Sequence, residues 1–174
     1  MNELRDYALW IIPEGKAYSE LKQLIDLLSR KYSTPSFDPH ITVLGRVTGY
    51  EKELTAKAAR LAGIIRPFAI SLRRIEYLDE YFRCLFILCN ESKELINLHN
   101  KAKTIFNIKD KKCYMPHISL MYGNLPAHLK DNIISDIGKD FPDTFEMQRI
   151  HLVSASIETD PKEWHSVKEF SLEQ

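Results

Sequence analysis

Apolar residues along this chain follow two periods, and these predict an alternation of strands and helices. Residues 7–12 are rich in aromatic and branched side chains and end at a Pro-Glu-Gly turn, which is typical of a strand. Residues 16–31 carry leucines and isoleucines at helical spacing, up to the stop at Pro35. The same patterns predict helices at 51–61, 92–106 and 126–137, and strands at 67–78, 81–89, 145–154, 164–172, from Pro39 onward and around His117.

The order of these elements is similar in the two halves of the chain. Each half reads as a strand, a helix, a strand that bears a histidine, a helix and a returning strand. This order predicts an α+β fold with two pseudo-symmetric lobes, in which antiparallel sheets line a central cleft and the helices lie outside. We expect residues 1–174 to form a single bilobal domain.

One short stretch occurs in both halves. Residues 39–45 read Pro-His-Ile-Thr-Val-Leu-Gly, and residues 116–123 read Pro-His-Ile-Ser-Leu-Met-Tyr-Gly. Successive side chains of a strand point to opposite faces, so His40 shares a face with Thr42, and His117 shares one with Ser119. If a twofold relates the lobes, all four polar side chains face one cleft.

Two imidazoles and two hydroxyls suit one type of reaction. Histidine titrates near neutral pH, so one ring can accept a proton while the other donates one. Neighbouring hydroxyl groups can donate hydrogen bonds to oxygens on which negative charge develops. Phosphodiester cleavage requires all these roles, and we therefore take His40 and His117 as the candidate catalytic residues, with Thr42 and Ser119 as candidate phosphate-binding residues.

Charge and composition narrow the choice of partner. The 174 residues contain 24 Lys and Arg and 24 Asp and Glu. The mixture gives no basic face for a long polyanion, and the cluster at 109–112 reads as a solvated loop, so a small anionic substrate fits better than extended nucleic acid. The charged start and the lack of a long apolar run indicate no signal peptide and no membrane span. We expect a cytoplasmic monomer.

Cysteines and the remaining histidines suggest neither disulfides nor a metal. The three cysteines are odd in number and lack a C-x-x-C spacing, and Cys84 and Cys89 read as small core residues. The two repeated motifs lack a third histidine or a carboxylate at ligand spacing, so we expect no metal and no cofactor. The other histidines read as helix-surface or strand residues (His99, His128, His151 and His165).

The paired motifs resemble those of the 2H phosphoesterase superfamily, and within it the plant and yeast type of cyclic nucleotide phosphodiesterase. Further support comes from Tyr-Ala-Leu-Trp at 7–10 and Tyr-Phe-Arg-Cys-Leu-Phe at 81–86. The resemblance implies metal-independent hydrolysis of ADP-ribose 1″,2″-cyclic phosphate to the 1″-phosphate, and of nucleoside 2′,3′-cyclic phosphates to 2′-phosphates.

The same resemblance implies roles for individual residues. His40 and His117 become the acid and base pair, and Thr42 and Ser119 hold the non-bridging oxygens. Tyr122 would border the phosphate pocket. Phe82 would lie beside the base or ribose, with Tyr81 as the competitor, because strand alternation lets only one of them face the cleft.

Two aspects of this resemblance stay open. We assign the base to His117 and the acid to His40, but pseudo-symmetry permits the reverse. The second motif departs from the family by carrying Ser119 instead of threonine, which retains the hydroxyl.

Two other functions remain open at this stage. Another branch of the superfamily acts on RNA ends or 2′,5′ linkages. A nucleotide-binding module could also keep the cleft without catalysis.

Overall fold

The computed structural model describes residues 3–173, and within this range eight strands, four α-helices and two short 3-10 turns form. The helices are α1 (Gly15–Tyr32), α2 (Glu51–Ala62), α3 (Lys93–Phe106) and α4 (Ala127–Ile137), and the turns are η1 (Tyr81–Arg83) and η2 (Pro161–Glu163). The strands are β1 (Arg5–Ile11), β2 (Ile41–Gly49), β3 (Phe68–Glu76), β4 (Leu85–Cys89), β5 (His117–Met121), β6 (Thr144–Met147), β7 (Arg149–Ser154) and β8 (His165–Ser171). The predicted α+β class is confirmed.

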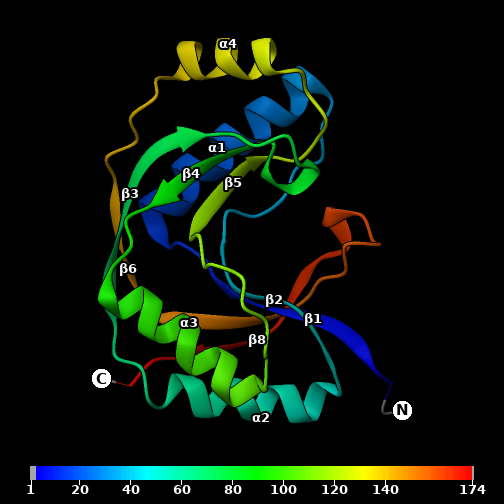
Figure 1. Cartoon of the computed structure of the whole chain (residues 1–174), viewed down its shortest axis with the longest axis vertical. Helices are drawn as coiled ribbons and strands as arrows, with labels where there is room; N and C mark the ends of the chain where they lie inside the picture. Colours follow the sequence, from blue (N-terminus) through cyan, green and yellow to red (C-terminus); the bar gives the residue numbers. More distant parts are fainter. Residues whose placement is uncertain (1–2, 174) are drawn as a thin grey trace.

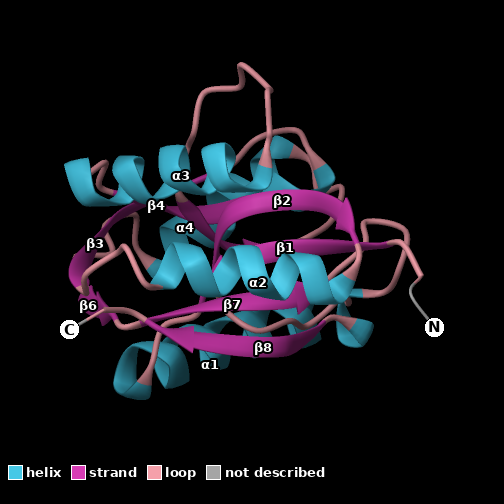
Figure 2. Cartoon of the chain, turned by 90° about the horizontal axis from the view of Figure 1, so that it is seen from below, coloured by secondary structure: helices cyan, strands magenta, loops and turns pink. Residues whose placement is uncertain are grey.

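The strands form one curled antiparallel sheet in the order β6-β3-β4-β5-β2-β1-β7-β8. We call β6-β3-β4-β5 with α1 and α4 the upper lobe, and β2-β1-β7-β8 with α2 and α3 the lower lobe (Figure 1). Helix α1 packs on β5, whereas α2 packs on β7 and β8 and α3 packs on β2. Figure 2 shows α2 and α3 together on the outer face of the lower lobe. The helices therefore cover the outer, convex face of the sheet. The concave face stays uncovered by these helices where β2 and β5 pair, and we call this junction of the two lobes the seam.

The helices form where the apolar spacing predicts them. In α1, residues Ala17, Leu21, Ile25 and Leu28 recur three or four positions apart and are buried against the sheet. The hydroxyl of Ser92 accepts a hydrogen bond of 3.1 Å from the Leu95 amide and so caps α3. Each of these helices buries one apolar face against the rest of the fold.

The composition of the lobes differs from the prediction. Each lobe does not correspond to one half of the sequence, because β1 pairs with β2 on one side and with β7 on the other. Strand β3 comes from the first half of the chain but lies beside β4 and β6. The halves therefore exchange strands, and the chain crosses the seam between the lobes several times.

Two predicted strands were wrong in their extent. Residues 81–83 form the turn η1 instead of starting a strand, held by hydrogen bonds from the Arg83 amide to Glu80 O and from the Gly123 amide to Tyr81 O. The predicted strand 145–154 divides into β6, which is one edge strand of the sheet, and β7, which lies next to the opposite edge strand. Aromatic and branched residues favour strands in general, and these patterns did not reveal the breaks.

Other expectations concern single features. Cys84 and Cys89 are buried in the core, as predicted, while Cys113 is exposed, and all three are free thiols. The Lys-rich segment 109–112 is an exposed loop, as predicted. Within residues 3–173, every helix is too short or too polar to cross a membrane.

The seam between the lobes is narrow. Strands β2 and β5 pair through Ile41 and Ile118, both fully buried. Because the strands are antiparallel, this pairing places His40 opposite Ser119 and Thr42 opposite His117. We expect Ile118→Ala to lower the free energy of unfolding by about 3 kcal/mol, because it leaves a cavity where the lobes join. Urea unfolding followed by circular dichroism measures this loss.

The matched control for this change is Ile64→Ala. Ile64 is 46% exposed, so its truncation should change the free energy of unfolding by no more than about 0.5 kcal/mol. Equal losses for the two variants would mean that the seam contributes nothing special to stability.

Candidate functional site

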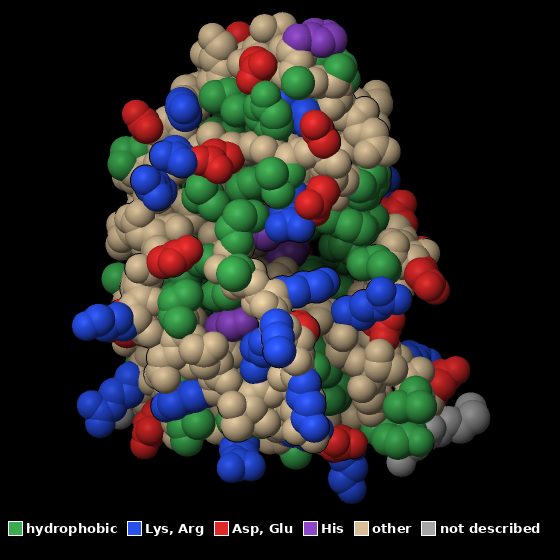
Figure 3. All heavy atoms as spheres, viewed as in Figure 1, with side chains coloured by type: hydrophobic (Ala, Val, Ile, Leu, Met, Phe, Trp, Pro, Cys, Tyr) green, Lys and Arg blue, Asp and Glu red, His purple; other side chains and the backbone are tan. Residues whose placement is uncertain are grey.

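A cavity of about 300 Å³ lies at the seam, and both repeated motifs line it. His40 and Thr42 enter from the lower lobe, and His117 and Ser119 from the upper lobe. Figure 3 shows histidine side chains deep in a hollow on this face, with Lys and Arg side chains around its mouth. The apolar members of the motifs point the other way, since Ile41, Val43, Ile118 and Leu120 are at most 1% exposed.

The two histidine rings are held in the same way. Nδ1 of His40 lies 2.6 Å from the carbonyl oxygen of Asp38, and Nδ1 of His117 lies 2.7 Å from that of Met115. A carbonyl oxygen can only accept, so each Nδ1 carries the proton and donates it. In both rings Nε2 is then the nitrogen that can take or give a proton to a ligand.

This contact alone does not mark a functional histidine. Nδ1 of His165 lies 2.9 Å from the carbonyl oxygen of Glu163, yet His165 is exposed at the start of the edge strand β8. What distinguishes His40 and His117 is that they line one cavity together with two hydroxyl groups.

Aromatic rings contact both imidazoles. The ring of Trp10 stacks on His40 at 3.6 Å between centroids, and Phe37 meets the same imidazole edge-on at 6.2 Å. Phe86 lies 5.1 Å from His117. Burial lowers the pKa of His40 to about 4, with a smaller contribution from the facing His117, and burial also lowers the pKa of His117. Both rings are therefore neutral at pH 7 in the empty cavity.

The hydroxyl groups differ in their partners. Within the described part of the chain, the Thr42 hydroxyl makes no hydrogen bond and is available to a ligand, whereas Ser119 Oγ donates to the Phe82 carbonyl oxygen at 3.2 Å. Tyr122 is 3% exposed and stacks on Phe37 at 3.9 Å. Burial raises the Tyr122 pKa, so its phenol stays protonated and can donate.

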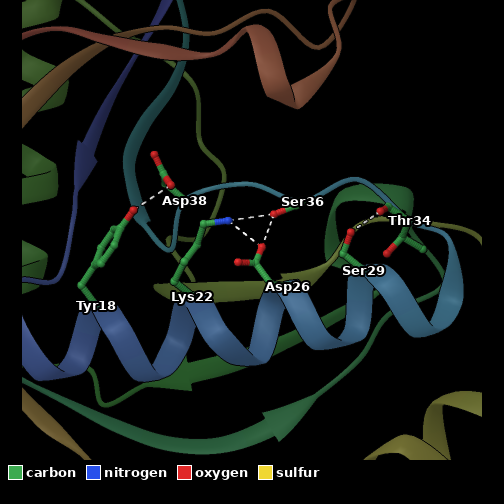
Figure 4. A network of polar contacts seen from close by, with 7 residues as sticks. All are labelled: Tyr18, Lys22, Asp26, Ser29, Thr34, Ser36 and Asp38. Atoms are coloured by element: carbon green, nitrogen blue, oxygen red, sulfur yellow. Dashed lines mark hydrogen bonds and ion pairs between the residues drawn. The ribbon is translucent and has the colours of Figure 1, made fainter.

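The chain before His40 is anchored to α1. Lys22 donates to Asp26 at 2.6 Å and to Ser36 at 2.8 Å, and Tyr18 donates to the Asp38 carboxylate at 2.8 Å (Figure 4). Burial, followed by the Asp38 contact, raises the Tyr18 pKa to about 12, which keeps the phenol a donor. The carbonyl oxygen that orients His40 belongs to this anchored segment.

The aromatic candidates are separated by the turn η1. Phe82 lines the cavity, whereas Tyr81 does not line it and is 40% exposed. Strand alternation is not the reason, because both residues lie in a 3-10 turn.

Several lining residues were not singled out by the sequence analysis. These are chiefly Trp10, Trp164, Arg46 and Arg83. Trp10 could have been found from the alternation along β1, since Ala8 and Trp10 line the cavity while Tyr7, Leu9 and Ile11 are buried in the main core. The position of Arg46 in the cavity lining depends on a local irregularity of β2, which a periodic sequence pattern does not reveal.

The remaining histidines lie outside the cavity lining. His99, on α3, has Nδ1 2.8 Å from the Val43 carbonyl oxygen, and His151 is buried on β7. His128 is exposed on α4. Among residues 3–173, no three His, Cys, Asp or Glu side chains lie close enough together to bind a metal ion.

Comparison with known proteins gives the family. The sequence profile of the cyclic phosphodiesterase-like protein family matches residues 6–172, which is nearly the whole chain. The chain belongs to this family. The predicted 2H phosphoesterase relationship is confirmed, and so is the enzyme class, a hydrolase of phosphodiester bonds.

Individual relatives agree with this family. A cyclic phosphodiesterase of Arabidopsis thaliana is 28% identical over 131 residues, which cover 72% of this chain and 70% of the relative. Among solved structures, E. coli LigT complexed with 3′-AMP has a TM-score of 0.70 at 16% identity, covering 99% of this chain and all of LigT. A protein of Thermus thermophilus has a TM-score of 0.69 at 16% identity, covering 96% of this chain and 97% of that protein. At these identities the structures show the shared fold.

The buried histidines predict how stability depends on pH. The folded-state pKa of His40 is about 4, below the ordinary value of 6.5, so the unfolded chain binds more protons between these values. Stability contributed by the neutral ring is present above pH 6.5 and is lost as the pH falls towards 4, by on the order of 3 kcal/mol. Urea unfolding at pH 7 and at pH 4 measures the loss.

The control compares His40→Gln with the wild-type protein. Other groups titrate over the same range in both proteins, so the difference between their slopes isolates His40. An identical pH dependence of the two proteins would contradict a buried neutral His40.

Proposed function

We propose that this protein hydrolyses small cyclic phosphates without a metal ion, with His40 and His117 as its acid and base pair. The substrates we infer are nucleoside 2′,3′-cyclic phosphates, giving 2′-phosphates, and ADP-ribose 1″,2″-cyclic phosphate, giving the 1″-phosphate. The observation that carries the proposal is the convergence of two identically oriented imidazoles and two hydroxyl groups on one cavity. Membership of the cyclic phosphodiesterase-like family supports the same reaction.

The proposed reaction is a single displacement at phosphorus. Nε2 of His117 removes a proton from water, whose oxygen forms a bond to phosphorus. The bond from phosphorus to one ribose oxygen breaks, and Nε2 of His40 donates a proton to that oxygen. The product is a phosphate monoester and a free ribose hydroxyl, and the two imidazoles have exchanged their protonation states.

The charge of the substrate changes the pKa values of the two histidines in this mechanism. Burial keeps both rings neutral in the empty cavity, but an anion bound between them favours a charged imidazole and raises its pKa. For His40 to act as the acid, the bound phosphate must raise its pKa from about 4. A protonated His40 is thus formed together with bound substrate, and does not remain in the empty cavity.

The hydroxyl groups bind the phosphate of the substrate, and the aromatic rings contact its phosphate, base or ribose. Thr42 and Ser119 donate to the non-bridging oxygens, and Ser119 leaves the Phe82 carbonyl oxygen to do so. Tyr122 borders the phosphate from its stack on Phe37. Phe82 contacts the base or ribose and tolerates different bases, because stacking is not specific to one of them.

The whole chain is proposed to act as one unit. Each lobe contributes one histidine and one hydroxyl, which supports a single bilobal phosphodiesterase domain over residues 1–174. We further propose that it functions as a cytoplasmic monomer. LigT has been solved with 3′-AMP and with NADP+, which supports a small nucleotide as the ligand of this fold.

The competing activity is cleavage of RNA ends or 2′,5′ linkages. Comparing turnover of a mononucleotide 2′,3′-cyclic phosphate with that of an oligonucleotide bearing the same end separates the two. Equal numbers of basic and acidic residues favour the small substrate.

Removing either imidazole should abolish most of the activity. We expect His40→Ala and His117→Ala each to lower kcat for adenosine 2′,3′-cyclic phosphate by about 10³-fold, because each removes a proton-transfer group. Thr42→Ala should lower kcat by about 10²-fold through loss of one donor to the phosphate. Product formation is followed by chromatography, with EDTA present throughout.

The control for these variants is His128→Ala, which changes an exposed histidine on α4. Its kcat should match the wild type. Turnover by His40→Ala at the wild-type rate, or loss of all wild-type activity on addition of EDTA, would contradict the metal-independent two-histidine reaction.

The division of roles is tested by the pH dependence of the residual rates. A general acid must be protonated in the substrate complex, so His40→Ala should remove the decline of kcat at high pH. A general base must be neutral, so His117→Ala should remove the decline at low pH. The opposite pattern would reverse the two roles, and retention of both declines in both variants would exclude this pair.

A further inference from the structure

The cavity carries a local excess of positive charge in a protein with no net formal charge. Besides the two histidines, its lining contains two ionisable side chains of full charge, Arg46 and Arg83, and among the described residues no carboxylate lines it. Much of the remaining wall is apolar or aromatic, including Trp10, Phe82 and Trp164. In the proposed reaction the cyclic phosphate takes two hydroxyls and two imidazoles as partners, which leaves the arginines available to a second anionic group.

Arg46 reaches the cavity from an irregular part of β2. The register between β1 and β2 shifts twice, between Tyr7 and Leu9 and between Leu9 and Trp10, and β2 supplies the extra residues. Gly45 and Arg46 of this bulged segment both line the cavity. Bulges next to functional sites commonly redirect a side chain.

The backbone of Arg46 is in the left-handed region, with φ of 54°. A residue with a Cβ is disfavoured there, and such conformations persist where the surroundings hold them. The surroundings of β2 do so: Tyr114 donates to the Thr42 carbonyl oxygen at 3.2 Å, and Nδ1 of His99 lies 2.8 Å from that of Val43. These two rings stack on each other at 3.9 Å. Two carbonyl groups of the irregular strand are therefore held by side chains from outside it.

The guanidinium of Arg46 is exposed to the cavity mouth and is not used by the fold. In the described part of the chain it forms neither an ion pair nor a side-chain hydrogen bond, whereas Arg83 is fixed by Glu80 through contacts of 2.6 and 2.8 Å. Arg83 lies in η1 on the upper lobe, so the two guanidinium groups flank the cavity from opposite lobes. Arg83 is therefore oriented by Glu80, whereas Arg46 has no such partner among the described residues.

We propose that Arg46, with Arg83, forms a second anion subsite that binds a phosphate ester on the 5′ oxygen of the ribose bearing the cyclic phosphate. This inference rests on the proposed function and adds a preference for one substrate class. A guanidinium binds phosphate oxygens in a bidentate manner. A 5′-monophosphate and a 5′-pyrophosphate share this chemistry, and substrates of both types distinguish them.

The test compares kcat/KM for adenosine 2′,3′-cyclic phosphate with and without a 5′-phosphate, and with a 5′-diphosphate. The wild-type protein should prefer a 5′-phosphorylated substrate by about tenfold, since one bidentate charge-assisted contact contributes roughly that factor. In Arg46→Gln this preference should fall to about twofold or less. Arg60→Gln removes the same charge from an exposed position on α2 and should retain the wild-type preference.

A second variant tests whether the loss of preference comes from misfolding, and it makes use of the left-handed backbone at Arg46. Arg46→Gly removes the guanidinium but accepts φ near 54° without strain. It should lose the preference as Arg46→Gln does, without a fall in the melting temperature. A loss of activity through misfolding is thereby separated from a loss of the subsite.

Binding measurements separate this inference from the proposed function. Calorimetry with adenosine 2′-phosphate and adenosine 2′,5′-bisphosphate needs no turnover, and the tighter binding of the bisphosphate should disappear in Arg46→Gln. A preference that persists in Arg46→Gln, or an equal loss for both classes of substrate, overturns the subsite. Absence of turnover by the wild-type protein with any cyclic phosphate instead overturns the proposed function, and the binding difference still decides the subsite.

Discussion

Ile41 of β2 pairs with Ile118 of β5, and the rest of the site depends on this contact. It is made by the central residue of each Pro-His-Ile-hydroxyl stretch, so the side chains on either side in sequence are brought to the same cavity. Strand alternation then requires that burying the two isoleucines turns the histidines and hydroxyls away from the core. A single apolar pairing thereby fixes four polar groups that come from two distant parts of the sequence.

The cavity combines low polarity with positive potential. Aromatic rings around the histidines make a charged imidazole unfavourable in the empty site, which lowers the His40 pKa to about 4. Two arginines at the mouth and the absence of lining carboxylates, within the residues described, favour the entry of an anion. The proposed chemistry follows from this combination, because the anionic substrate itself creates the conditions under which one ring is protonated.

The order of the predicted elements was sufficient to predict the fold class, and the repeated motifs predicted four residues that line the cavity. Period-two alternation determines which side of β2 and β5 is polar, and it correctly separated Ile41 and Ile118 from His40 and His117. It could not reveal which strands form each lobe, because pairing such as that of β1 with β7 joins opposite ends of the chain. No local pattern encodes that partner. Features that break periodicity, such as the turn η1 and the bulge that carries Arg46, were missed for a related reason, since only their hydrogen bonds and backbone angles reveal them.

The central claim is that the two motifs are halves of one phosphate site. A crystal structure of the protein with inorganic phosphate tests it most directly. The account predicts one phosphate ion within hydrogen-bonding distance, about 2.6–3.2 Å, of Nε2 of both histidines and of the hydroxyls of Thr42 and Ser119. A phosphate bound by one motif alone, or bound outside the cavity while both motifs remain unoccupied, would contradict it.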